Sequence, residues 1–271
     1  MARPVILRAV LLFAVLAIAL SGCGQHENPA ANHSARSDKT ASPHVVPNVT
    51  DCLSGQETEF TRWNLPQGIR LGADVWRPMG PWRECLQYQP GTLHIRWSFQ
   101  KGTQVQAYPH LSISGRLNVS IASDTPLYTR ATIDDRCASG SECHYDVGYD
   151  IWMTRTSTEK PRSPDGAELM VFWKYDLPSP GRQHLVKKVN LDGTRWSVYL
   201  LHPEGWPLVQ YIPQQPIDST AMNLMDFVQD AKNSGLLKGM RYVAKVDFGA
   251  ELAGGKGRVG IYRWSMQGSS S

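Results

Sequence analysis

The sequence predicts an all-β fold, a sandwich of two antiparallel sheets with one α-helix packed outside it. From Asp51 onward the chain consists of short runs that alternate between apolar and polar residues, and Gly, Pro, Asn and Asp separate these runs. Only one segment has a helical pattern. With 41% hydrophobic and 19% charged residues, the chain has a globular composition and can bury a sizeable core. A chain of 271 residues can hold one large all-β domain or two small domains, and we expect one.

Seven segments have the alternation of a β-strand, and a further pair of strands follows the helical segment. The seven strands are expected at 92–100, 110–121, 147–155, 168–176, 184–191, 194–202 and 206–214. The helix is expected over 218–237, with Asp218 or Ser219 as its N-cap and Gly235 at its C-terminal exit. The final pair of strands surrounds the runs RYVAKVDFG and GRVGIYRWSM.

Residues 1–23 have the pattern of an export signal. A basic start precedes an apolar run from Ala9 to Leu20, which is short for a membrane span, and small residues follow it. The ending Leu20-Ser21-Gly22-Cys23 resembles a bacterial lipobox, whose cysteine is lipidated and becomes the first mature residue. We therefore expect a protein that a lipid at Cys23 anchors to a bacterial membrane, at the cell surface or facing the periplasm. The alternative is a plain secreted protein cleaved near the same place, released outside the cell.

Residues 24–50 are rich in Ser, Ala, Asn, His and Pro and have no hydrophobic period, which predicts a flexible tether. The folded domain is expected over 51–266, and residues 267–271 are expected to form a disordered tail. The net charge of +4 comes without a long Lys/Arg run, which argues against a nucleic-acid partner. We expect a monomer.

Five cysteines in an exported chain leave one without a partner, and lipidation of Cys23 accounts for it. The remaining four allow three disulfide pairings. We expect Cys52 to pair with Cys85 and Cys137 with Cys143, because each pair flanks its own unit of strand and turn. The chain has no C-x-x-C and no H-E-x-x-H motif, so a zinc site is not indicated.

The tetrapeptide Gly-Ala-Glu-Leu occurs twice, and each copy places a glutamate, Glu168 or Glu251, among apolar residues of a predicted strand. Strand alternation puts Glu168, Met170 and Phe172 on one face. Partial desolvation and neighbouring carboxylates keep one such group protonated while another stays charged. Cleavage of a glycosidic bond needs that division between two carboxyl groups. The alternative is that each glutamate is a solvated or paired surface residue.

The segments around these glutamates resemble sequence motifs of glycoside hydrolase family 12, which contains endoglucanases and xyloglucanases. The family motif E-[LI]-M-[IV]-W is similar to AELMVFWKYDLPSPG, and F-G-T-E-P-F-x-G-x-G is similar to VDFGAELAGGKG. Further family strands resemble, in the same order, GYDIWM, TRWSVYLL and PLVQYIP, and the predicted helix matches the single helix of the family. The upstream run GADVWRPMGPW resembles N-N-L-W-G, and family members have disulfides where the two cysteine pairs fall. The resemblance covers residues 51–266.

The resemblance implies a β-jelly roll of two curved antiparallel sheets, whose concave sheet forms an open groove for a β-1,4-linked glucan. It implies double displacement with retained configuration and without a metal or organic cofactor. Glu168 corresponds to the nucleophile, Glu251 to the general acid/base, and Asp150 to the partner of the nucleophile. The residues that it places along the substrate cleft are Trp76, Asp74, Met170, Phe172, Pro180 and Gly181.

Several positions depart from the family motifs. Phe172 stands where the family has Trp, Leu252-Ala253 replaces Pro-Phe, Asp74 replaces Asn, and Ser179-Pro180-Gly181 replaces Pro-Ile-Gly. We expect these changes to set the substrate preference among cellulose, mixed-linkage glucan and xyloglucan. A non-catalytic glycan-binding envelope protein on the same fold is the alternative function. A related jelly-roll hydrolase such as a xylanase is a third interpretation.

Overall fold

The structure is a computed structural model that describes residues 45–113, 117–160, 165–203 and 205–267. The predicted export signal, the predicted lipidation site at Cys23 and most of the predicted tether lie outside the described residues, as does the tail from residue 268. Within the described part of the chain, no helix is long and apolar enough to cross a membrane. The predicted folded domain of residues 51–266 lies almost wholly inside it, and its first strand begins slightly earlier, at Val49.

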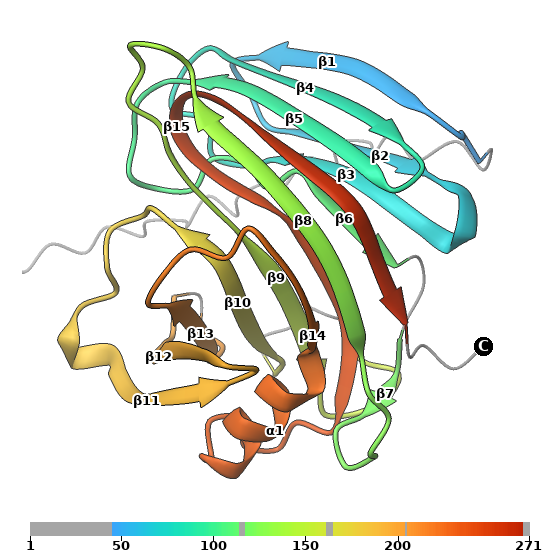
Figure 1. Ribbon diagram of the computed structural model, residues 1–271, viewed down its shortest axis with the longest axis vertical. Coiled ribbons are helices and arrows are strands. Elements are labelled where there is room, and N and C mark those ends of the chain that lie inside the picture. Colours follow the sequence, from blue (N-terminus) through green and yellow to red (C-terminus); the bar gives the residue numbers. More distant parts are fainter. Residues whose placement is uncertain (1–44, 114–116, 161–164, 204, 268–271) are drawn as a thin grey trace, which may run out of the picture. The chain divides into compact units, whose positions relative to one another are not determined.

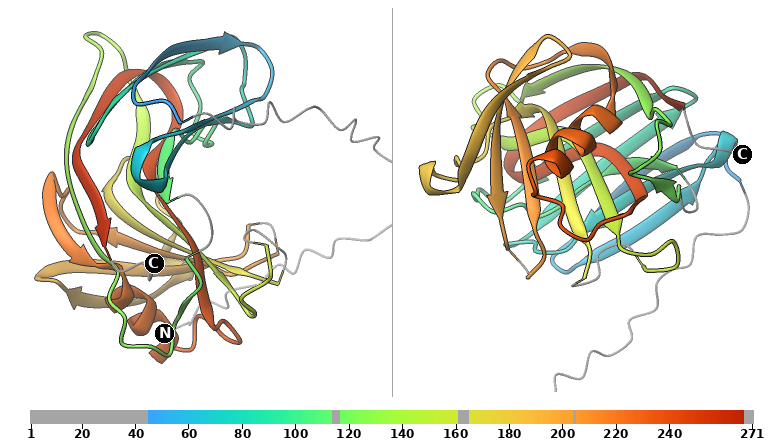
Figure 2. Two further views of the ribbon diagram at one scale, coloured as in Figure 1. Left: turned by 90° about the vertical axis from the view of Figure 1, so that its right-hand side faces the viewer. Right: turned by 90° about the horizontal axis from the view of Figure 1, so that it is seen from below.

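The described residues form two curved sheets that share one long strand (Figures 1 and 2). The first sheet contains, in spatial order, β2 (Glu59–Asn64), β3 (Ile69–Val75), β6 (His110–Ile113), β15 (Tyr242–Gln267), β9 (His144–Thr154), β10 (Ala167–Tyr175), β13 (Leu208–Pro213), β12 (Thr194–Leu201) and β11 (Leu185–Leu191), and the short β7 (Val119–Ser120) also pairs with β15. The second sheet contains β1 (Val49–Gly55), β4 (Trp82–Gln89), β5 (Thr92–Phe99), β15, β8 (Tyr128–Cys137) and β14 (Ser219–Asn223). Two 3-10 turns, Pro66–Gly68 and Arg182–His184, complete the elements with the single α-helix. The predicted all-β sandwich is confirmed.

Strand β15 corrects the prediction of a final pair of strands, because it is one continuous strand of 26 residues. Its residues 242–254 pair with β9 in the first sheet, and from Gly255 onward it pairs with β5 and then β8 in the second. Gly255 has φ +77°, and a Cβ there would lie 2.1 Å from the Glu142 carbonyl oxygen. The glycines that suggested a break therefore allow the strand to cross between sheets.

The helix α1 (Leu224–Asn233) starts later than predicted. The segment expected to be its first turn is the strand β14, which pairs with β8, so tertiary pairing overrides the local helical pattern. The N-cap is Asn223, not Asp218 or Ser219, and its side chain accepts a hydrogen bond from the Met225 amide at 3.2 Å. Gly235 follows the helix with φ +73°, as predicted.

The β10–β13 pair is parallel, whereas the other paired strands of the described residues are antiparallel. The three-stranded meander β11–β12–β13 folds back so that β13 lies beside β10 and follows its direction. This pairing was not predicted, and it decides which residues surround Glu168. The predicted strand at 110–121 is interrupted, and only β6 and β7 form within it.

Both predicted disulfides are present. Cys52–Cys85 joins the paired strands β1 and β4, with Cα atoms 4.0 Å apart. Cys137–Cys143 joins the end of β8 to the residue before β9, with Cα atoms 5.7 Å apart. Each bridge therefore holds neighbouring segments together at an end of the second sheet.

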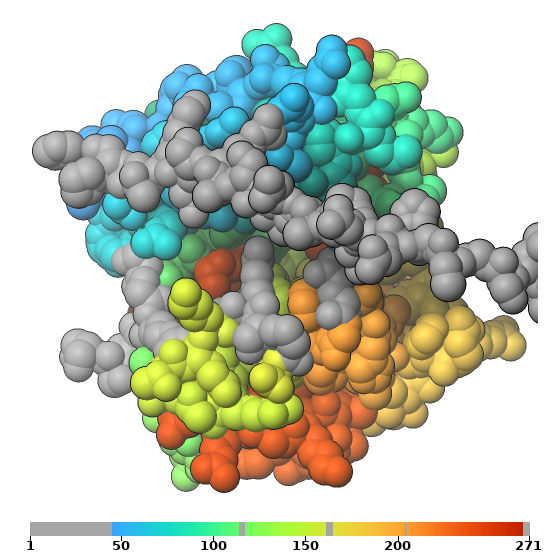
Figure 3. Space-filling model, turned by 180° about the vertical axis from the view of Figure 1, so that it is seen from behind, coloured from blue at the N-terminus to red at the C-terminus, as the bar shows by residue number. Residues whose placement is uncertain are grey.

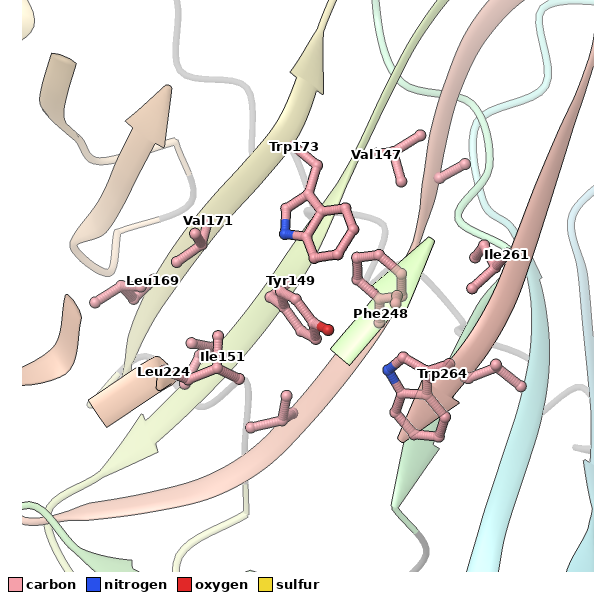
Figure 4. Packing of buried hydrophobic residues seen from close by; sticks show 14 of the residues in the cluster. Val147, Tyr149, Ile151, Leu169, Val171, Trp173, Leu224, Phe248, Ile261 and Trp264 are labelled. Carbon is pink, nitrogen blue, oxygen red and sulfur yellow. The ribbon is translucent and has the colours of Figure 1, made fainter. Parts of the chain in front are cut away.

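Aromatic side chains from three neighbouring strands fill the core between the sheets (Figure 4). Tyr149 of β9 stacks on Phe248 of β15 with ring centroids 4.3 Å apart, and Trp173 of β10 lies 5.2 Å from Phe248. All three are fully buried. Because successive side chains of a strand point to opposite faces, this packing turns the alternate residues of β9, β10 and β15 toward the other face of the first sheet.

Candidate active site

Three neighbouring strands carry the carboxyl groups on the face that turns away from the core. Strand β9 lies between β10 and β15, and Glu168 of β10 is opposite Trp152 of β9. Glu251 of β15 is opposite Asp146 of β9. Asp150 lies on β9 between Asp146 and Trp152. Residues that face each other across paired strands point to the same side of a sheet. The acidic side chains of all three strands therefore share one face.

A pocket of about 380 Å³ lies over this face, within the size range of ligand sites. Figure 3 shows the molecule with a hollow between its blue and cyan N-terminal strands and its yellow-green and orange segments. The residues that line the pocket are Phe60, Trp76, Arg77, Tyr108, Asp150, Trp152, Glu168, Trp206 and Glu251. Of the residues selected from the sequence, the pocket thus brings together the three carboxyl groups and Trp76.

Two tryptophans donate hydrogen bonds to the carboxyl groups of the pocket. The indole Nε1–H of Trp206 donates to Oε2 of Glu168 at 2.9 Å, and that of Trp152 donates to Oδ2 of Asp150 at 2.7 Å. The two indoles meet edge to face, with centroids 5.6 Å apart. Trp206 reaches Glu168 because of the parallel β10–β13 pairing, in which the Glu168 amide donates to the Pro207 carbonyl at 3.0 Å.

Neither tryptophan was among the site residues predicted from the sequence. Trp152 shares a strand face with Asp150, so alternation could have placed it in the site. Trp206 lies two positions before β13, and only the unpredicted parallel pairing places it beside β10. A long-range pairing of this kind leaves no local signal in the sequence.

Negative charge is concentrated around Glu251. Asp146, which is 1% exposed, lies opposite Glu251 across the β9–β15 pair, so the two carboxyl groups are neighbours. Its burial, and then the charge of Glu251, raise the pKa of Asp146 well above its usual range. Burial also raises the pKa of Tyr175, which lies opposite Asp146 on β10, and the charges of Asp146 and Glu251 add to that rise. The site therefore favours protonated forms of its buried acids.

The pocket is also bounded by Tyr108, which is 3% exposed and donates its hydroxyl hydrogen to the Gly148 carbonyl at 3.4 Å. Burial raises the pKa of this phenol, and the charge of Asp150 is the next largest cause of the rise. Tyr108 therefore stays neutral as a polar wall of the pocket.

Five of the predicted substrate contacts are not among the residues that line the pocket. Asp74 is 1% exposed and forms an ion pair with Arg62. Pro180 and Gly181 lie in the loop between β10 and β11. Met170 and Phe172 do point to the face predicted for them, but they are buried.

The physical reason for the burial of Met170 and Phe172 is a second, small hydrophobic cluster on this face. They pack with Leu208 of β13, and the cluster is covered by three half-buried side chains, Tyr175, Leu201 and Ile212. Alternation predicted the face correctly, but it could not show that the neighbouring strands would cover these two side chains.

The segment after Glu251 is also buried. Leu252 and Ala253 are fully buried, and the Leu252 amide donates to the Ala107 carbonyl at 2.8 Å. Neither residue therefore presents its side chain to the pocket. In addition to Tyr108, Trp152 and Trp206, the pocket has aromatic side chains at Phe60 of β2 and at Trp76, directly after β3.

Comparison with known proteins places this fold and pocket in a family. The sequence profile of glycosyl hydrolase family 12 matches residues 86–267. Endoglucanase S of Pectobacterium parmentieri is 24% identical over 204 residues, which cover 68% of this chain and 75% of that protein.

Solved structures of the same family have the same fold. A family 12 xyloglucanase from Bacillus licheniformis superposes with a TM-score of 0.68 at 20% identity, over 80% of this chain and 99% of that one. Endoglucanase 3 from Trichoderma harzianum superposes with a TM-score of 0.68 at 17% identity, over 80% of this chain and 97% of that one. At these identities the superpositions establish the jelly-roll fold, and the sequence profile, which spans most of the chain, establishes the family. The chain belongs to glycosyl hydrolase family 12.

Proposed function

We propose that this protein is a retaining endo-acting glycoside hydrolase that cleaves β-1,4-glucan chains, with Glu168 as the nucleophile and Glu251 as the general acid/base. The observation that supports this best is that both carboxyl groups, carried by the two strands that flank β9, line one open pocket. The relatives are an endoglucanase and a xyloglucanase, which supports a β-glucan as the substrate. An open groove suits attack within a chain rather than at its end.

In the first step the Glu168 carboxylate attacks the anomeric carbon, and Glu251 gives its proton to the leaving oxygen as the glycosidic bond breaks. The product is a covalent glycosyl-enzyme. In the second step Glu251 takes a proton from water, whose oxygen attacks the anomeric carbon and frees Glu168. Two displacements at one carbon retain its configuration.

The hydrogen bonds of the site support these roles. The Trp206 indole holds one oxygen of Glu168, which fixes the orientation of the carboxylate before attack. Asp150, buried beside the nucleophile strand, is held in turn by Trp152, and we assign it the role of partner to Glu168. Phe60 and Trp76 offer ring faces on which sugar rings can stack, and Arg77 offers hydrogen-bond donors to sugar hydroxyls.

The test is hydrolysis of carboxymethyl cellulose, barley β-glucan and xyloglucan by the wild type, Glu168→Ala and Glu251→Ala. Glu142→Ala, at an exposed glutamate outside the pocket, is the matched control. We expect the control to act like the wild type, and each site variant to lose about a hundredfold to ten-thousandfold in rate or more. Azide should restore turnover of an activated aryl cellobioside by both site variants, with products of opposite anomeric configuration.

The possible outcomes separate the parts of the proposal. If the wild type releases no reducing ends from any of the three glucans but is retained on them in a pull-down, the non-catalytic glycan-binding function replaces hydrolysis. If either alanine variant keeps wild-type activity, the site assignment fails. If proton NMR shows that the first product has the inverted configuration, the double displacement fails.

We also propose that the protein is exported and anchored by a lipid at Cys23. The lipobox-like sequence Leu20-Ser21-Gly22-Cys23 supports the anchor. The two disulfides support an oxidising compartment, because such bonds are rare in proteins that stay in the cytosol.

A further inference from the structure

Asp146 is a buried carboxyl group directly beside the proposed acid/base, and the reaction written above does not use it. It lies on β9, opposite Glu251 of β15 on one side and opposite Tyr175 of β10 on the other. Side chains at such opposite positions have Cβ atoms about 4.5–5.5 Å apart. Asp146 is 1% exposed, whereas Glu251 is half-buried and lines the pocket. Asp146 is therefore a buried acid next to Glu251, the acid that faces the pocket.

The groups that face Asp146 are acids or phenols. They come from every strand packed against it: Glu251 from β15, Tyr175 from β10, Asp150 from its own strand, and the Tyr108 phenol, whose pKa the charge of Asp146 helps to raise. An ionised Asp146 would thus be a buried anion next to a second carboxylate. Two carboxyl groups in such contact titrate as one unit.

The contact between Asp146 and Glu251 affects one step of the reaction, the transfer of the Glu251 proton. When Glu251 gives up its proton to the leaving oxygen, a carboxylate forms next to Asp146. If Asp146 were ionised, the step would produce two adjacent anions in a site of low dielectric constant. If Asp146 is protonated, its O–H bridges to the new carboxylate and stabilises it, as hydrogen bonds to ionised groups are the stronger ones.

We propose that Asp146 is a positioning residue that stays protonated and donates a hydrogen bond to the Glu251 carboxylate as that carboxylate forms. This inference rests on the proposed function. The proton balance of the reaction is unchanged, because the proton of Asp146 remains within the pair and Glu251 is reprotonated by the attacking water. The burial of Asp146 and its raised pKa agree with this role.

The basic limb of the pH profile of kcat/KM is then set by the deprotonation of the Asp146–Glu251 pair. The form active in bond cleavage carries two protons, so activity falls when the pair loses its first proton, although one proton remains. Asp146→Asn keeps a donor of similar shape that does not titrate. It should therefore move the basic limb of kcat/KM to higher pH, by about one pH unit or more, the coupling expected of interacting carboxyl groups.

The experiment measures kcat/KM against pH for the wild type, Asp146→Asn and Asp146→Leu. One substrate is an unactivated cello-oligosaccharide, and the other is a dinitrophenyl β-cellobioside, whose leaving group needs no proton. Asp134→Asn, at an exposed aspartate paired with Arg258 on the second sheet, is the control. We expect Asp146→Leu to lose tenfold or more in kcat on the oligosaccharide, the size of one hydrogen bond to a charged group, and to keep its activity on the dinitrophenyl substrate.

An unchanged or lowered basic limb for a folded Asp146→Asn variant overturns the inference, as does an equal loss on both substrates for Asp146→Leu. If the variants do not fold, carbon-13 NMR of the wild-type carboxyl groups decides the question. Asp146 must then remain protonated well above the ordinary aspartate pKa of about 3.9. A wild type that cleaves neither substrate refutes the proposed function itself, and the role of Asp146 falls with it. A wild type that cleaves both but shows no shift refutes the role of Asp146 alone.

Discussion

Glu84 is an acid enclosed in the core, and its replacement tests the electrostatics of the fold. It lies on β4 between the buried residues Trp82 and Leu86 at alternate positions, and it is 0% exposed. Neither of its carboxyl oxygens has a hydrogen-bond partner among the described residues. Burial, and then the charge of Asp74, raise the pKa of Glu84 from 4.5 to about 8.

The sign of the effect on stability follows from the protons that each state binds. Below pH 4.5 both the folded and the unfolded chain carry the proton of Glu84. Between pH 4.5 and about 8 the unfolded chain releases it while the folded chain keeps it, so the free energy of unfolding falls as the pH rises. The loss is about 1.4 kcal/mol for each pH unit, which amounts to on the order of 5 kcal/mol over the whole interval.

The assay is urea denaturation of the wild type and Glu84→Gln at pH 5, 6.5 and 8, with the disulfides intact. The amide has nearly the shape of the neutral acid but does not titrate, so the difference between the two proteins isolates Glu84. We expect this difference to shift in favour of the glutamine variant by about 3 kcal/mol between pH 5 and pH 8. Glu142→Gln, at an exposed position, should show no such trend. A difference that stays constant from pH 5 to pH 8 would refute a neutral buried Glu84.

Two further predictions concern the site and the anchor. Trp206→Phe removes the indole donor from Glu168 but keeps a ring against Trp152, so we expect kcat to fall about tenfold, with a smaller change in KM, in steady-state hydrolysis of β-glucan; an unchanged kcat would show that the indole does not orient the nucleophile. Cys23→Ala, expressed in a bacterium, should move the protein from the detergent phase to the aqueous phase in a detergent partition, because the acyl chains are lost. Equal partition of the wild type and the variant would contradict lipid anchoring.

The alternation of apolar and polar residues was sufficient to predict most strands and the faces of β10. Glu168 could be assigned to the pocket face and Trp173 to the core face because the side-chain period of a strand is two. The helix illustrates the limit of local patterns. The helix was predicted to include residues 219–223, but pairing with β8 makes them a strand, and Asn223 becomes the cap.

The environment of Phe172 could not be predicted, because it depends on strands distant in the sequence. The alternation within a strand determines the face to which a side chain points. Whether other side chains bury it depends on which strand pairs next to its own. The parallel β10–β13 pairing brings Leu208 into one buried cluster with Met170 and Phe172, and it places Trp206 beside Glu168. One unpredicted pairing thus explains both the burial of Phe172 and the donor to Glu168 that was not predicted.

The family profile covers one wall of the pocket but not the other. Glu168, Glu251 and Asp150 lie within the segment that the family profile matches, residues 86–267, whereas Phe60, Trp76 and Arg77 precede it. The changes after Glu251 that suggested an altered specificity are in the core and cannot touch a sugar. The chemistry of this chain can therefore be proposed from its family. We expect its preference among β-glucans to depend on β2, β3 and the residues just after them, the part of the pocket that lies outside the segment matched by the family profile.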